Sequence, residues 1–119
     1  MSEAPETFRD LVARVEAFRD ARDWRQFHSL RNLAAAISIE AAELQQTLLW
    51  SDDQGEQAIL AGQKERLEEE LADVLILCAN FASIAEIDLP GALERKLRTN
   101  ELKYPIEQAR GSHRKYSGT

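Results

Sequence analysis

The sequence predicts an all-α protein, specifically a four-helix bundle. Its Leu, Ala, Glu and Arg content favours helices, apolar residues recur at three- and four-residue spacings, and no stretch shows the alternation of a strand. The 119 residues are 44% hydrophobic and 30% charged, which fits one domain with one core. We expect a single domain over residues 1–119, with a helical core over about 6–104 and four helices joined by modest loops.

Two amphipathic helices are expected in the first half of the chain. The first begins near Phe8 and ends near Asp23. Its apolar residues form one stripe: Phe8, Leu11, Val12, Val15 and Phe18. Residues 23–28 follow as an ordered loop that holds two aromatic residues and one of the two histidines. Ser29 can cap the second helix, which we expect to end near Trp50.

Two more helices are expected in the second half. Residues 51–56 predict a turn or connection that Gly62 closes. The third helix then carries the strongest apolar stripe: Leu67, Leu71, Val74, Leu75, Cys78, Phe81, Ala82 and Ala85. Asp88 and Pro90 suit the start of a fourth helix, which Pro105 stops near Lys103. Residues 105–119 form a basic tail, which we expect to be flexible unless a ligand or a neighbouring subunit holds it.

Charge and cysteine content argue against several classes of protein. The net charge of −6 opposes non-specific nucleic-acid binding, which needs basic surface. The single cysteine, Cys78, cannot form an internal disulfide and reads as a buried structural thiol, while no apolar run has the length of a signal peptide or a membrane span. We expect a cytoplasmic protein that binds neither nucleic acid nor a membrane.

Two acidic pairs lie on the flanks of the two most apolar helices. Glu40 and Glu43 are one turn apart on the second helix, and Glu70 and Asp73 are one turn apart on the third. If these helices pack antiparallel, four carboxylates converge and need a cation to offset their repulsion. Carboxylate oxygens suit Mg²⁺, with Mn²⁺ as a substitute. The competing interpretation is that these acids only face water, as we expect for residues 68 and 69, because acidic residues number 21.

Aromatic side chains near these acids offer surfaces for stacking. Trp50 lies about 10 Å along the helix from Glu43, which is near the reach from the phosphates of a nucleotide to its base. A base could also stack on the segment of Trp24, Phe27 and His28. The alternative is that both tryptophans are core or interface anchors and that His28 is structural.

The fourth helix offers donors for phosphate oxygens. Lys96, Asn100 and Lys103 follow one stripe, with Tyr104 alongside. Lysines on a helix surface also commonly face only solvent, so on spacing alone both interpretations stay open.

The pattern Glu40-x-x-Glu43 followed by Glu70-x-x-Asp73 resembles the metal motif of the MazG-like all-α NTP pyrophosphatases. Further strings are similar to the dCTP pyrophosphatase branch of that superfamily. They run from about Phe8 to Tyr116: Arg22-Asp23-Trp24, Gln26-Phe27-His28, Arg31-Asn32-Leu33, Trp50, Glu69-Glu70-Leu71, Asp73-Val74-Leu75-Ile76, Asp88-Leu89-Pro90, Tyr104-Pro105 and Arg114-Lys115-Tyr116. This coverage makes the resemblance far more specific than two acidic pairs.

The resemblance implies a homodimer or homotetramer that hydrolyses a nucleoside triphosphate, dCTP or modified dCTP, to the monophosphate and pyrophosphate with Mg²⁺, in nucleotide pool sanitation. It implies that four residues bind the metal and carry catalysis: Glu40, Glu43, Glu70 and Asp73. Substrate contacts would come from nine others: Trp24, Phe27, His28, Asn32, Trp50, Lys96, Asn100, Lys103 and Tyr104. Leu77 stands where family members can carry a tyrosine, which leaves the base preference open.

Two other functions stay open at the level of sequence. One keeps the fold and the metal but hydrolyses dUTP or a broader set of nucleotides. The other is a non-catalytic helical oligomer that acts as an interaction or regulatory module. The general base is also open, between the four carboxylates and Glu69, as are the choice of dimer or tetramer and the role of the basic tail.

Overall fold

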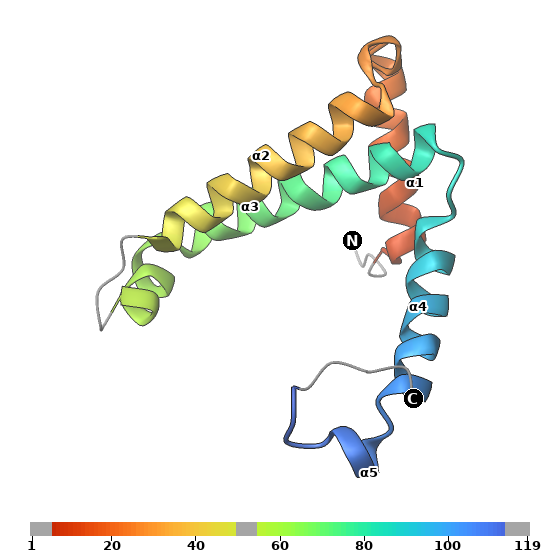
Figure 1. Cartoon of the computed structure of the whole chain (residues 1–119). Helices are drawn as coiled ribbons and strands as arrows, with labels where there is room; N and C mark the ends of the chain where they lie inside the picture. The colour runs from red at the N-terminus through yellow and green to blue at the C-terminus, as the bar shows by residue number, and fades with distance from the viewer. Residues whose placement is uncertain (1–5, 50–54, 114–119) are drawn as a thin grey trace, which may run out of the picture. The chain divides into compact units, whose positions relative to one another are not determined.

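The computed structural model describes residues 6–49 and 55–113, and every regular element within them is helical (Figure 1). The all-α prediction is therefore confirmed. Contacts divide the chain into two units, which meet between Ile87 and Asp88. The elements of the first unit are α1 (Phe8–Ala21), the short 3₁₀ helix η1 (Arg25–Phe27), α2 (Leu30–Leu49) and α3 (Gly55–Ile84), and those of the second are α4 (Leu89–Lys103) and α5 (Ile106–Ala109).

A capping box starts α1. The Oγ1 atom of Thr7 accepts a hydrogen bond from the Asp10 backbone N at 3.1 Å, and the Asp10 Oδ2 atom accepts one from the Thr7 backbone N at 3.3 Å. The helix ends at Ala21, and Asp23 follows with a φ of 54°. The expected loop over residues 23–28 contains the single turn of η1.

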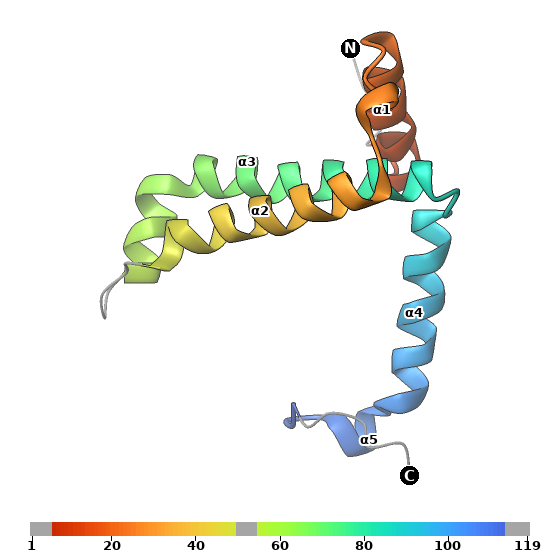
Figure 2. The same cartoon turned by 45° about the horizontal axis from the view of Figure 1, so that its top comes forward.

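The packing of α2 on α3 forms the main helix pair (Figures 1 and 2). Ser29 caps α2 as predicted, because its Oγ atom accepts a hydrogen bond from the Asn32 backbone N at 3.1 Å. The two helices run antiparallel and side by side in both views. Antiparallel packing of these two helices is the arrangement in which the sequence predicts that the two acidic pairs converge.

The start of α3 differs from the prediction. The helix begins at Gly55 and not after Gly62, so the expected connection over residues 55–62 was wrong. Its residues 56–61 include Glu, Gln, Ala and Leu, which favour helix and outweigh the two flanking glycines. A break remains at Gln63, whose φ of −134° and ψ of 26° are not helical. Residues 51–54 of the expected connection lie outside the described part.

The apolar stripes expected to form the core are only partly covered within one chain. Among the described residues the buried apolar side chains are those of Leu33, Ala79 and Ala82, and no large side chain is fully buried. Leu71 and Leu75 on α3 are each 52% exposed, and the predicted buried thiol of Cys78 is half-buried. The first unit therefore leaves apolar surface uncovered.

The second unit begins and ends its long helix as predicted. Asp88 occupies the N-cap position of α4, Pro90 lies in the first turn, and the helix ends at Lys103 before Pro105. A Cβ atom at Gly91 would lie 2.5 Å from the Asp88 Oδ2 atom, so a larger residue there would displace the Asp88 side chain. The predicted tail begins with the helix α5, and its residues 114–119 lie outside the described part. None of the described helices combines the length and the apolar character needed to cross a membrane.

A candidate metal centre between two helices

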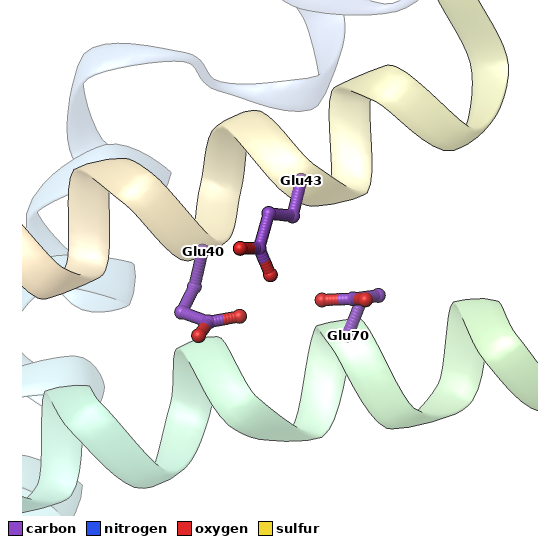
Figure 3. A group of neighbouring side chains, drawn as sticks. All are labelled: Glu40, Glu43 and Glu70. Carbon is purple, nitrogen blue, oxygen red and sulfur yellow. The ribbon is translucent and has the colours of Figure 1, made fainter.

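Three carboxylates converge between α2 and α3. Glu40 and Glu43 project from α2 and Glu70 from α3, and all three point into the space between the helices (Figure 3). One oxygen from each lies within 4.8 Å of the others. The one-turn spacing within α2 and the antiparallel pairing with α3 produce this group, as the sequence predicts.

Two oxygens of this group are buried without a hydrogen-bond partner among the described residues. They are the Oε2 atoms of Glu40 and Glu70. A side-chain hydrogen bond with Glu43 raises the pKa of Glu40 to about 7, and burial and the charges of the other carboxylates act in the same direction. Buried carboxylate oxygens without a hydrogen-bond partner are what a bound cation would stabilise.

Asp73 lies one turn after Glu70 on α3, with an exposed side chain. It is not among the three side chains whose oxygens lie within 4.8 Å of one another, but its charge contributes to the raised pKa of Glu40. Glu68 and Glu69 are exposed, as expected for acids that only face water. On α3 the structure thus separates Glu70, which joins the group, from the exposed acids Glu68 and Glu69 that precede it.

Aromatic residues predicted to contact a nucleotide lie near the end of α1. Trp24 is 46% exposed, and its ring packs edge-to-face on Phe18 with a centroid distance of 5.6 Å. The Arg22 guanidinium lies over the ring of Phe18 in a cation–π contact, with the Arg22 Cζ atom 3.5 Å from the ring centroid. Phe27 is 68% exposed. The loop therefore exposes the rings of Trp24 and Phe27, and packing on Phe18 fixes the ring of Trp24.

His28 and Asn32 flank the start of α2. The Nδ1 atom of His28 is buried and has no hydrogen-bond partner within residues 6–49 and 55–113. Burial lowers the pKa of His28, and the positive charge of Arg19 lowers it further, so the ring is neutral at pH 7. Asn32 is exposed. Trp50, predicted to border the base, lies outside the described residues.

The predicted phosphate-binding residues belong to the second unit. Lys96 and Lys103 on α4 are exposed, whereas Asn100 and Tyr104 are half-buried. The Tyr104 backbone N donates to the Asn100 carbonyl at 2.8 Å and ends the helix. All four residues lie on or directly after α4, as the spacing predicts, and their proposed role is unchanged.

A buried polar cluster at the end of α3 was not among the predicted site residues. Arg19 of α1 is 2% exposed and donates from Nη1 to the Ser83 Oγ atom at 2.8 Å. Asn80, one turn before Ser83, is 7% exposed. A sequence signal existed, because Arg19 lies four residues after Val15 on the apolar stripe of α1. A polar residue on an apolar stripe marks a buried polar contact.

Comparison with known proteins identifies the family. Residues 35–118, more than half of the chain, match the model of the MazG-like family. The chain belongs to the MazG-like family. The chain is 40% identical over 117 residues to the dCTP pyrophosphatase 1 of Rattus norvegicus, covering 96% of this chain and 69% of the relative. It is 39% identical to that of Homo sapiens, with the same coverage. The predicted resemblance is confirmed.

A solved structure shares the MazG-like fold of this chain. The crystal structure of a pyrophosphatase from Archaeoglobus fulgidus matches with a TM-score of 0.74 and 38% sequence identity. The match covers 88% of this chain and 98% of the other. The helical arrangement and the sequence therefore lead to the same family.

Proposed function

We propose that this protein is a Mg²⁺-dependent nucleoside triphosphate pyrophosphohydrolase that cleaves dCTP or modified dCTP to the monophosphate and pyrophosphate. Membership of the MazG-like family supports this proposal, as does the identity of about 40% to proteins named dCTP pyrophosphatase 1. The observation that carries it is the group formed by Glu40, Glu43 and Glu70, whose oxygens lie within 4.8 Å of one another.

The donor set fits a hard divalent ion. Its ligands are carboxylates only, and the Oε2 atoms of Glu40 and Glu70 are buried with no hydrogen-bond partner among the described residues, so both oxygens are available to a cation. Mg²⁺ prefers such oxygens together with water and phosphate. We propose that Glu40, Glu43 and Glu70 hold the ion and that Asp73, exposed one turn along α3, completes the set.

The chemistry follows from this placement. Mg²⁺ held by Glu40, Glu43 and Glu70 would supply positive charge that offsets the triphosphate and would favour attack of water on the α-phosphorus. The protein supplies orientation, because the carboxylates come from two packed helices and not from loops. The proton of the attacking water goes to one of the four carboxylates or to Glu69, and the packed ring of Trp24 offers a face on which the base can stack.

Pyrophosphate release tests this function directly. It is measured for dCTP, 5-methyl-dCTP, dUTP and dATP, with and without Mg²⁺, for the wild type and a folded Glu43→Ala, Asp73→Ala double variant. Glu68→Ala is the matched control, since Glu68 is an exposed acid on the same helix. Mg²⁺-dependent release that is lost only in the double variant supports the proposal. Preference for dUTP, or equal turnover of all four, would indicate a broader pyrophosphatase, and no release at all would favour an interaction module.

We also propose that the protein functions as a homodimer or homotetramer. Leu71 and Leu75 lie one turn apart on α3 and are each 52% exposed, and the described part of the chain fully buries no large side chain. A second copy of the chain would cover these apolar faces, since soluble monomers rarely expose contiguous apolar surface. Sedimentation equilibrium of the wild type tests this, and a monomer at micromolar concentration would contradict it.

A further inference from the structure

Asn80 carries a buried polar atom that the fold does not satisfy. The side chain is 7% exposed, and its Oδ1 atom has no hydrogen-bond partner among the described residues. Buried amide oxygens are nearly always paired, because leaving one unpaired costs folding free energy. A residue retained at this cost is a candidate for contact with a ligand.

A polar contact between α1 and α3 lies one turn after Asn80 on α3. Ser83, one turn later on α3, accepts the hydrogen bond from the Arg19 Nη1 atom at 2.8 Å, while the Arg19 Nε atom donates to the Asp20 Oδ1 atom at 2.9 Å. The end of α3 therefore holds the unpaired Asn80 Oδ1 atom one turn before a serine that binds a buried arginine of α1.

The position of Asn80 along α3 relates it to the carboxylates. Asn80 follows Asp73 by seven residues, which is about two turns or about 10 Å along the helix axis. The two side chains leave the helix in directions that differ by only about 20° around this axis. Leu77 lies between them on the same stripe. This length is comparable with the distance from the α-phosphate of an extended nucleotide to its base. A triphosphate held at the acidic end of the stripe would thus bring its base to Asn80.

We propose that Asn80 contacts the base of the nucleotide and contributes to base preference. The proposal rests on the proposed function, since it places the α-phosphate at the carboxylates. The Asn80 Oδ1 atom would accept a hydrogen bond from the 4-amino group of cytosine, and the Nδ2 amide would donate to N3 of the ring. Leu77, between Asp73 and Asn80, would lie beside the sugar. Because the side chain of Leu77 is apolar, the polar contact to the base would come from Asn80.

Asn80→Leu tests the proposal, because leucine has a similar shape but no polar atoms. We expect the KM for dCTP to rise about tenfold with a smaller change in kcat, and the preference for dCTP over the other nucleotides to narrow. Inhibition by inorganic tripolyphosphate, which has no base, should not change. The melting temperature of the ligand-free protein should stay the same or rise, because an unpaired buried oxygen is removed. Gln45→Leu, an exposed amide on α2, is the matched control and should behave as the wild type.

Three results would overturn the proposal. They are an unchanged KM for dCTP, a weaker inhibition by tripolyphosphate in proportion to the rise in KM, or a lower melting temperature with no change in base preference. If Asn80→Leu does not fold, Asn80→Asp replaces it. This second variant keeps the size but loses the donor to N3, so the same rise in KM for dCTP is expected, and an unchanged KM again refutes base contact.

Failure of the proposed function gives a different result from failure of the base contact. If the wild type releases no pyrophosphate from any nucleotide, the enzyme proposal fails, and calorimetry with Mg²⁺ and dCTP then tests Asn80 alone. About tenfold weaker binding of dCTP in Asn80→Leu, with unchanged binding of tripolyphosphate, would support base contact. Equal binding of dCTP by the wild type and the variant, or no binding by either, would refute it.

Discussion

Competition between a proton and a metal ion at Glu40 gives the prediction that the structure defines most sharply. The carboxyl of Glu40 hydrogen-bonds Glu43 and has its pKa raised from 4.5 to about 7 in the metal-free protein. A metal ion binds the ionised carboxylate, so it must displace this proton. One competing proton with a pKa of about 7 weakens the apparent affinity for Mg²⁺ about tenfold between pH 8 and pH 6. Binding should release about 0.9 proton at pH 6 and about 0.1 at pH 8.

Calorimetry in two buffers with different enthalpies of ionisation measures both the affinity for Mg²⁺ and the number of protons released on binding. The perturbation is Glu40→Gln, which removes the titrating group, so the remaining affinity should no longer change as the pH passes 7. Glu68→Gln is the matched control on α3 and should keep the wild-type pH dependence, because Glu68 is exposed. A wild-type affinity that changes less than twofold between pH 6 and pH 8, with no proton released, would show that no proton on Glu40 competes with the metal ion.

The same group fixes the sign of the pH dependence of stability. The pKa of Glu40 is raised in the folded state, so between about pH 4.5 and 7 the folded protein holds a proton that the unfolded chain has lost. The free energy of unfolding of the metal-free protein should therefore fall as the pH rises through this range, and then level off. Saturating Mg²⁺ should remove this loss, since a ligand that binds only the folded state stabilises it. Urea unfolding at pH 5 and pH 8, with and without Mg²⁺, measures the difference.

Three further predictions concern the fold. Thr7→Ala should lower the free energy of unfolding by about 1 kcal/mol in urea denaturation, because it removes the capping box of α1; no change would exclude a role of the cap. Arg19→Ala should lower the free energy of unfolding by about 1.5–3 kcal/mol, because it breaks a buried charged hydrogen bond to Ser83. The control Arg14→Ala should lower it by less than about 1 kcal/mol, since the ion pair of Arg14 is exposed. Equal losses in the two variants would contradict this prediction. Leu75→Glu should shift sedimentation toward the monomer, and an unchanged assembly would place the interface elsewhere.

Local signals in the sequence predicted the helices and most of their boundaries. Ser29, Pro90 and Pro105 act through hydrogen bonds or backbone restrictions within a few residues, so their effects can be read without knowledge of packing. Asp88 occupies the predicted N-cap position of α4, but its side chain makes no capping hydrogen bond. The start of α3 at Gly55 was missed because two glycines suggested a loop, while the helix-forming residues between them determined the result.

The carboxylate group was predictable because it needs little tertiary information. One-turn spacing aligns Glu40 with Glu43, and an antiparallel partner helix brings Glu70 opposite them. The raised pKa of Glu40 was not predictable to a value, since it depends on the distances between the carboxylates and on their burial.

The polar cluster of Arg19, Ser83 and Asn80 required the structure. It depends on which part of α1 crosses which part of α3, and spacing along one helix does not contain that information. The half-exposed Leu71 and Leu75 show a related limit. An apolar stripe indicates that a helix face needs to be covered, but it does not distinguish a core within the chain from a contact with a second chain.

We propose that this protein cleaves nucleoside triphosphates between the α- and β-phosphates in a reaction that depends on the carboxylates of α2 and α3. Hydrolysis of dCTP with Mg²⁺ in water labelled with oxygen-18, followed by mass spectrometry of the products, tests this proposal. We expect dCMP and pyrophosphate, with the label in dCMP, and no products for the Glu43→Ala, Asp73→Ala double variant. Label in pyrophosphate, release of dCDP with inorganic phosphate, or full activity of the double variant would contradict it.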